Sequence, residues 1–164
     1  MRKKTNVILG VVIACFAIVA AIILIVAIVS NIPKETIPEN VDMQALSNSI
    51  EEVTNLDSTK MQQITAEDLS NDFKLDPSWI EEYIGEKPFL NITSSMYVIV
   101  KVTDSNVENV LNAFEEYGKS YDELWKDYLA EEYELVKNRS IGAKGNYAYF
   151  IVSDYANEIV DLIK

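Results

Sequence analysis

An uncharged apolar run near the start constrains this chain more than any other feature. Residues 7–29 (VILGVVIACFAIVAAIILIVAIV) include no charged or strongly polar side chain over 23 consecutive positions. As an α-helix rising about 1.5 Å per residue, the run is roughly 34 Å long, enough to cross a hydrocarbon core of about 30 Å. Arg2, Lys3 and Lys4 precede it, and basic residues favour the cytoplasmic side. The sequence therefore predicts one membrane-spanning helix, with the N-terminus in the cytoplasm and the C-terminal bulk outside.

The apolar run is interpreted as an uncleaved signal anchor. It is longer than the roughly 7–15 apolar residues of a cleaved signal peptide, and no small-x-small site follows it. The alternative is a lipoprotein, because Val12-Ile13-Ala14-Cys15 fits the loose pattern in which a small residue precedes a lipid-modified cysteine. A lipoprotein would turn polar after that cysteine, whereas this chain continues apolar to residue 29. Cys15 is therefore interpreted as a small apolar side chain inside the helix rather than as a lipidation site.

Four segments follow from this interpretation: a cytoplasmic tail (1–6), the anchor (7–29), a linker (30–40) and an extracytoplasmic domain (41–164). The linker holds Pro33 and Pro38 and no periodic apolar pattern, which is typical of an extended tether. The chain beyond the anchor contains all 26 acidic residues and 11 of the 14 basic ones, which gives it a net charge of −15. Such a surface repels nucleic acids and anionic lipid, so we expect no nucleic-acid partner and a bilayer contact only through residues 7–29.

Composition excludes several classes of site. The chain has no histidine, so Ser-His-Asp and Cys-His centres and histidine-bound zinc are excluded. Its single cysteine excludes a structural disulfide within the chain. Acidic pairs such as Glu51/Glu52 and Glu131/Glu132 are adjacent in sequence, and adjacent side chains on a helix point apart. These pairs are interpreted as solvated helix faces rather than as the facing acids of a glycoside hydrolase.

One acidic segment has the spacing of a calcium loop. Asp104-x-Asn106-x-Glu108 matches it superficially, but the loop's glycine position is occupied by Asn109. Ser105-x-x-Glu108 is better explained as a capping box that opens a helix. The sequence therefore predicts no catalytic residue, no metal and no cofactor.

Apolar periodicity predicts an α+β domain. Alternating or β-branched runs predict strands over 96–102, 140–143 and 147–152, with a short extended piece at 61–64 and a turn at Lys144-Gly145-Asn146. Three- and four-residue spacing predicts helices over 41–53, 66–73, 107–128, 131–138 and 154–163. Thr65 is the expected cap of the second helix and Gly118 an interruption of the third. Residues 80–84 fit either a helical turn begun at Asp76-Pro77 or a strand. The expected fold is a small, mainly antiparallel sheet with helices packed on one face, preceded by the transmembrane helix.

Tyrosines provide the candidate interaction face. Tyr147 and Tyr149 share one side of a predicted strand, and with Tyr97 they would lie on an open face of the sheet if helices covered only the other. Such rings can stack on sugars or receive a protein partner. The alternative is that helices pack on both faces.

Several short motifs are similar to those of a known family. Asp76-Pro77 with Glu81-Glu82-Tyr83, the strand ending in Val100-Lys101-Val102, Glu132-Tyr133-Glu134-Leu135 and Lys144-Gly145-Asn146-Tyr147 resemble an uncharacterised bacterial domain of unknown function. The resemblance spans roughly 41–164. It implies a domain tethered outside the cytoplasmic membrane by a lipid or a single helix, with no established active site to carry over. Many relatives look lipid-modified, and in this respect the predicted anchor departs from them.

The expected function is a non-catalytic binding module at the cell envelope. A wall glycan or an envelope protein is the expected partner. The alternatives are a carboxylate-based envelope hydrolase and an accessory subunit of a membrane complex, in which the anchor helix itself makes contacts.

Overall fold

The structure, a computed structural model, describes residues 40–54, 59–103 and 105–164. These residues form eleven helices and strands. The predicted tail, the anchor with Cys15, the linker before Asn40 and Asp104 of the calcium-like segment lie outside these residues. Within the described ranges, no helix has the length and apolar character needed to cross a membrane. In chain order the elements are α2 (Met43–Thr54), β1 (Met61–Gln63), α3 (Ala66–Asn71), the 3-10 helix η1 (Pro77–Trp79), β2 (Ile80–Pro88), β3 (Met96–Val102), α4 (Val107–Trp125), α5 (Ala130–Lys137), β4 (Ser140–Lys144), β5 (Tyr147–Val152) and α6 (Ala156–Leu162).

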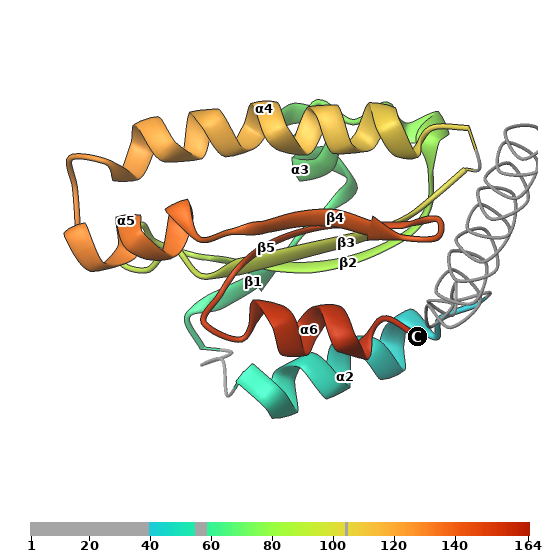
Figure 1. Cartoon of the computed structure of the whole chain (residues 1–164), viewed down its shortest axis with the longest axis horizontal. Coiled ribbons are helices and arrows are strands. Elements are labelled where there is room, and N and C mark those ends of the chain that lie inside the picture. The colour runs from blue at the N-terminus through green and yellow to red at the C-terminus, as the bar shows by residue number, and fades with distance from the viewer. Residues whose placement is uncertain (1–39, 55–58, 104) are drawn as a thin grey trace, which may run out of the picture. The chain divides into compact units, whose positions relative to one another are not determined.

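The strands form one antiparallel sheet in the order β1-β2-β3-β5-β4 (Figure 1). β3 lies at its centre, and its apolar side chains are buried on both faces because the strand alternates between two separate cores. Met96, Val98, Val100 and Val102 face the core under α3, α4 and α5. Tyr97 and Ile99 face a second core under α2 and α6.

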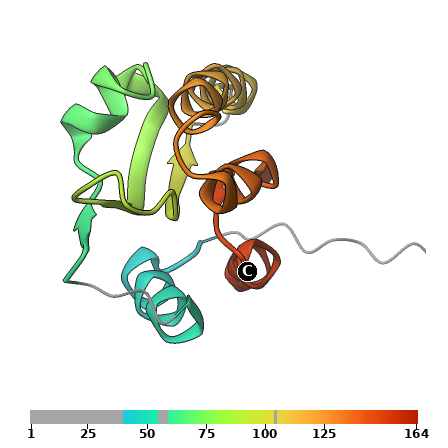
Figure 2. The ribbon, with the colours of Figure 1, turned by 90° about the vertical axis from the view of Figure 1, so that its left-hand side faces the viewer.

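Helices therefore pack on both faces of the sheet, and the prediction of helices on one face is wrong. Figure 2 shows α2 and α6 side by side below the sheet, opposite α3 and α4. The physical reason lies in the apolar stripes of these two helices. Four apolar side chains of these helices are at most 4 % exposed: Leu46 and Ile50 on α2, Ile159 on α6, and Ile163 directly after α6. They are buried against the second face of the sheet.

Some predictions about helix caps and single segments are confirmed and others are wrong. Thr65 caps α3 in a capping box with Asp68, as expected. Residues 80–84, for which the sequence allowed a helical turn or a strand, form part of strand β2. Asp76 and Pro77 start only the single 3-10 turn η1 before this strand begins. The capping box predicted at Ser105 is wrong. Asn106 is the N-cap of α4 and makes no side-chain cap; its amide donates instead to Thr103 Oγ1 at 2.8 Å.

Gly118 does not interrupt α4, which runs unbroken to Trp125. The residue is buried where the Arg139 guanidinium crosses the helix, and a Cβ there would lie 2.6 Å from Arg139 Nε. The guanidinium is held in place by Asp122, at 2.7 and 3.0 Å. The absence of a side chain at Gly118 thus admits an ion pair that joins α4 to the start of β4.

Candidate functional site

The tyrosine face predicted from sequence is closed. Tyr97 is 1 % exposed and Tyr147 is fully buried, both in the core beneath α2 and α6. The Tyr147 hydroxyl accepts a hydrogen bond from the backbone N–H of Val41 at 2.8 Å. Tyr149 is half-buried and packs against the same core. Of the two interpretations of Tyr97, Tyr147 and Tyr149, an open interaction face or helices packed on both faces of the sheet, the structure agrees with the second.

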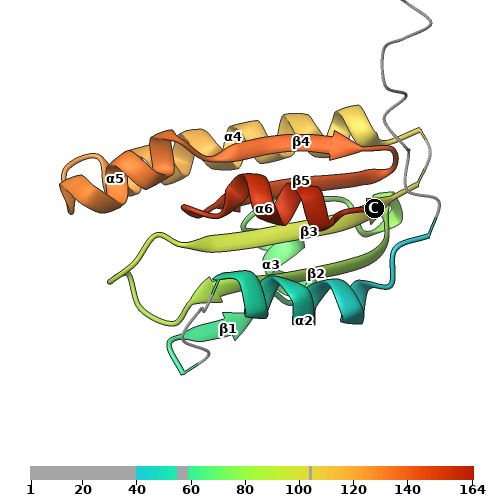
Figure 3. The same ribbon diagram turned by 60° about the horizontal axis from the view of Figure 1, so that its bottom comes forward.

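A different surface, the loop hollow, lies between the β2–β3 connection and the C-terminal half of α4. It has a volume of about 510 Å³ and a mixed apolar and polar lining. Figures 1 and 3 both show this connection and the C-terminal end of α4 at the same end of the domain. Its lining residues are Gln62, Asp72, Lys87, Pro88, Phe89, Asn91, Met96, Tyr117, Ser120, Tyr121 and Leu124.

The rim of the loop hollow exposes large apolar side chains. Phe89 and Leu124, which line the hollow from opposite sides, are 57 % and 49 % exposed. Leu90 and Ile92 belong to the same β2–β3 connection as Phe89, outside the lining itself, and are 66 % and 55 % exposed. Water around such side chains is released when a partner covers them. Exposed apolar side chains gathered around a hollow, rather than scattered singly, are typical of a binding surface.

The loop that carries these side chains is fixed at its base. Ser94 is fully buried, and its backbone N–H and Oγ donate to Glu132 Oε2 on α5 at 2.6 and 2.7 Å. The Ser94 carbonyl accepts a hydrogen bond from the Tyr121 hydroxyl at 3.0 Å. The apolar tip of the loop is thus presented from a rigid base, which reduces the entropy that binding would cost.

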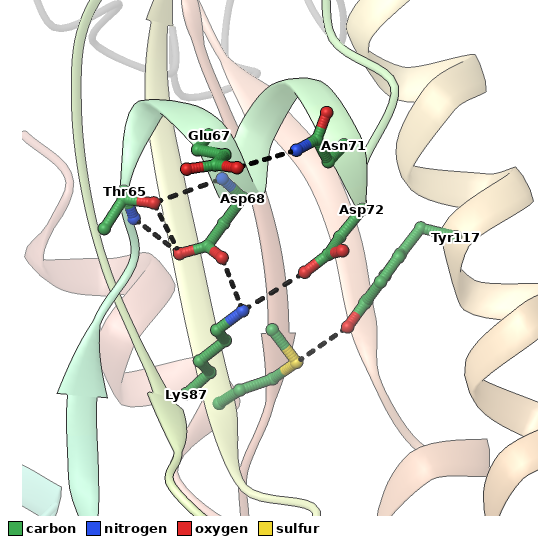
Figure 4. Close-up of polar contacts among 8 residues, drawn as sticks. Thr65, Glu67, Asp68, Asn71, Asp72, Lys87 and Tyr117 are labelled. Carbon is green, nitrogen blue, oxygen red and sulfur yellow. Dashed lines mark hydrogen bonds and ion pairs between the residues drawn. The ribbon is translucent and has the colours of Figure 1, made fainter.

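An ion network lies beside the hollow (Figure 4). Lys87 Nζ is 2.7 Å from Asp68 Oδ1 and 3.1 Å from Asp72 Oδ2. Burial alone would raise the pKa of Asp68, but hydrogen bonds from Lys87 and Thr65 lower it below its ordinary value. Burial alone would lower the pKa of Lys87, but hydrogen bonds to both aspartates raise it. Asp68 and Lys87 therefore stay charged at neutral pH, and Lys87 is not available as a nucleophile.

The two tyrosines that line the loop hollow, Tyr117 and Tyr121, are also unsuited to acid–base catalysis. The Tyr117 hydroxyl points to Met96 Sδ at 3.8 Å, and burial raises its pKa. Burial raises the pKa of Tyr121 to about 12. Both phenols remain protonated at neutral pH and serve as apolar walls with a donor at the tip, not as general bases.

A second surface, the α2 hollow, lies between α2 and the β1–β2 edge of the sheet. It has a volume of about 290 Å³, and Glu51 and Glu86 are among the residues that line it. Glu86 is 9 % exposed, and its Oε2 has no hydrogen-bond partner. Burial raises the pKa of Glu86, and the nearby carboxylate of Glu51 raises it further. A third hollow, of about 590 Å³, is lined mainly by polar side chains of α5 and the β5–α6 turn, and its arginine, Arg139, is already paired with Asp122.

Glu86→Gln should stabilise the protein at pH 7 by about 1 kcal/mol, because it removes a buried charge without changing the shape of the side chain. A carboxyl with a raised folded-state pKa favours folding at low pH. That contribution is lost as pH rises from the unfolded pKa through the folded one. The stability that Glu86→Gln gains over the native chain should therefore vanish below about pH 4. It should reach its full value above the pKa of Glu86 in the folded protein. Thermal unfolding at several pH values tests this, with exposed Glu52→Gln as the control; a gain independent of pH would contradict the prediction.

The described residues also lack a cluster of side chains that could bind a metal ion. No three His, Cys, Asp or Glu side chains there come together in a way that could hold an ion.

Sequence reasoning missed both hollows. The signal for the loop hollow was present in Phe89-Leu90-Asn91-Ile92, where apolar residues occupy a connection between strands that usually carries polar turn residues. Glu86 had no such signal, because its burial depends on α2, a helix far away in the sequence.

Comparison with known proteins gives one match. Residues 54–153 match the model of a domain of unknown function, DUF4358. No curated protein and no solved structure matches the chain. The matched range contains all five strands and the whole loop hollow, whereas α2 and α6 lie almost entirely outside it.

Proposed function

This chain belongs to the DUF4358 family, and we propose that it is a non-catalytic binding module at the outer face of a membrane. The loop hollow receives its partner, an apolar segment of another envelope protein. The observation that carries the proposal is the set of exposed apolar side chains on a loop whose base is fixed by Glu132. The net charge of −15 beyond residue 29 favours a partner in which basic residues flank the apolar segment.

The proposal of binding without catalysis is supported by the chemistry of the loop hollow. Lys87 is held in an ion network with Asp68 and Asp72, and its raised pKa keeps it protonated. The two phenols are protonated as well. Neither Lys87 nor either phenol has the pKa near neutrality that general acid–base catalysis favours.

The anchor is the second part of the proposal. The apolar run 7–29 would place the domain outside, with the linker holding it near the bilayer. We expect a membrane-impermeant maleimide to label Glu108→Cys in intact cells, in a chain whose Cys15 has been replaced by serine. Labelling only after lysis would contradict this orientation. An intact mass lacking residues 1–14 and carrying acyl chains on Cys15 would instead support the lipoprotein alternative.

Site-specific photocrosslinking from the rim of the loop hollow tests the binding role. A photoreactive amino acid at Phe89 or Leu124 should capture one protein in native membranes, and the same probe at exposed Asn112, in the N-terminal half of α4, should not. Capture of the same proteins from all three positions would overturn the proposal. Labelled glycan at Phe89 would point to the wall rather than to a protein.

The double variant Phe89→Ala/Leu124→Ala should reduce co-purification of that partner at least tenfold while leaving the unfolding temperature nearly unchanged. Both side chains are largely exposed, so they contribute little to the core, whereas apolar side chains at the centre of an interface often contribute more than about 1.4 kcal/mol to binding. Tyr155→Ala is the matched control, since Tyr155 is a 40 % exposed aromatic outside the loop hollow. An equal loss in the control would show that the loop hollow is not special.

A carboxylate-based hydrolase is the second candidate, favoured by Glu51 and Glu86 in one hollow. A retaining or inverting glycosidase uses one carboxyl with a raised pKa and one ionised partner. Glu86 has the raised pKa, although one of its oxygens is covered. Turnover of a wall glycan above about 1 s⁻¹, abolished in Glu86→Gln but not in Glu52→Gln, would establish this candidate.

A further inference from the structure

We propose that the α2 hollow binds a primary alkylammonium group, such as a lysine side chain or a free diamine. This site is separate from the loop hollow, and its test does not depend on the proposed partner there. The argument rests on the burial of Glu86, the charge of the lining, and the size and chemistry of the hollow.

Glu86 is a buried acid that lacks a countercharge. In the β2–β3 register it lies opposite Tyr97, on the sheet face that α2 covers. More than nine-tenths of the residue is buried, and its Oε2 has no hydrogen-bond partner. A carboxylate in this environment is costly unless a cation or a proton neutralises it. A proton is one solution, and a bound cation is the other.

The lining of the α2 hollow offers acceptors but no cation. Among the described residues that line it, Glu51 and Glu86 are the charged ones, and none is a lysine or arginine. Glu51 is close enough to raise the pKa of Glu86. Figure 3 shows α2, which carries Glu51, running alongside the β1–β2 edge that carries Glu86. Two carboxylates that repel one another across a hollow are both stabilised by one cation between them.

The remaining lining matches an alkylammonium group. Gln44, Ser47 and Gln63 contribute neutral oxygen acceptors, and Ile64, Tyr83 and Ile84 contribute apolar surface. An ammonium has three N–H donors, so two carboxylates and a neutral oxygen satisfy it. Its alkyl chain can pack on the apolar side chains while the charged end reaches the acids.

Other cations fit less well. The hollow, at about 290 Å³, is far larger than a bare metal ion, and no third acidic side chain joins the two carboxylates in the described part of the chain. Calcium prefers six to eight oxygen ligands. A guanidinium binds best when both oxygens of a carboxylate are accessible, and one oxygen of Glu86 is covered. A compact ammonium needs neither condition.

The test measures thermal unfolding of the full chain in detergent, monitored by the fluorescence of its two tryptophans, Trp79 and Trp125. The probes are Nα-acetyl-lysine-N-methylamide and 1,5-diaminopentane at about 10 mM, compared with the trimethylated lysine analogue and calcium chloride at equal ionic strength. We expect the two primary amines to raise the unfolding temperature by about 3 °C, as a millimolar ligand should. The larger shift identifies the source, a protein lysine or a free diamine.

The variants decide whether the shift belongs to this site. Glu86→Gln and Glu51→Gln should each abolish the amine-dependent shift, whereas Glu52→Gln, on an exposed position of the same helix, should keep it. The proposal is overturned if the primary amines give no shift, if the trimethylated analogue works equally well, if calcium alone stabilises, or if the shift survives in Glu86→Gln. Because Glu86→Gln is expected to unfold at a higher temperature than the native chain, loss of the shift there cannot arise from misfolding.

Discussion

Replacing Gly85 by alanine is expected to destabilise the domain by about 3 kcal/mol. Gly85 is a buried residue of β2, next to the point where β1 ends; Ile64, which directly follows β1, donates its N–H to the Gly85 carbonyl at 2.8 Å. A Cβ at this position would lie 2.6 Å from the Tyr97 carbonyl oxygen, 2.9 Å from Ile64 Cγ1 and 3.2 Å from Val98 Cα. Two of these atoms are backbone of the central strand, which cannot move without breaking its ladder, so overpacking is severe.

Gly118→Ala is the matched control for this prediction, because it adds the same methyl group to another buried glycine. There the nearest atoms belong to the end of the Arg139 side chain, which can shift, and alanine gains about 1 kcal/mol of helix propensity over glycine. We expect the stability of Gly118→Ala to stay within about 1 kcal/mol of the native chain. Urea unfolding followed by tryptophan fluorescence measures both variants. Equal stability of Gly85→Ala and the native chain would show that Tyr97, Val98 and Ile64 do not crowd Gly85 as described.

The elements that were predictable from sequence are those whose signal is local. The alternation of β3 and the Gly145 turn, where φ is 60°, depend on neighbouring residues and are found as expected. The cap of α3 is local too, since Thr65 and Asp68 are three residues apart. At α4 the capping box predicted at Ser105 is not found: Asn106 is the N-cap, and its side-chain amide donates to Thr103 Oγ1 instead of capping the helix.

The sites were not predictable because they are built from distant segments. Period-2 alternation correctly places Tyr97 and Tyr147 on one face, but it does not say which helix covers that face. Lys87 on β2 meets Asp68 of α3 and Asp72 at the end of that helix, and Glu86 lies against α2. In each case the residue type was visible in the sequence, whereas its environment depends on the tertiary fold.

Glu132→Ala is expected to destabilise the domain by about 2 kcal/mol, the cost of one buried donor without its acceptor, and to weaken partner binding together with it. The Glu132 carboxylate accepts hydrogen bonds from the backbone N–H and the hydroxyl of Ser94, at 2.6 and 2.7 Å, and Ser94 is fully buried. Without the carboxylate, the Ser94 N–H loses its acceptor, whereas the Ser94 hydroxyl can still donate to the Glu132 backbone carbonyl at 3.1 Å. An unsatisfied buried donor costs about 1–3 kcal/mol. Urea unfolding measures the loss, and Glu131→Ala, at the exposed neighbouring position, should change stability little.

The same substitution separates the base of the loop from its tip. Hydrogen exchange of the amides in 89–95 should accelerate in Glu132→Ala, because the connection is no longer held to α5. Phe89, Leu90 and Ile92 remain present but are no longer presented from a rigid base, so ordering them costs entropy when a partner binds. Glu132→Gln should recover part of the stability, since its amide oxygen can still accept a hydrogen bond from Ser94. If partner capture is unchanged in Glu132→Ala while exchange of the loop accelerates, the rim side chains bind without preorganisation and Glu132 serves stability alone.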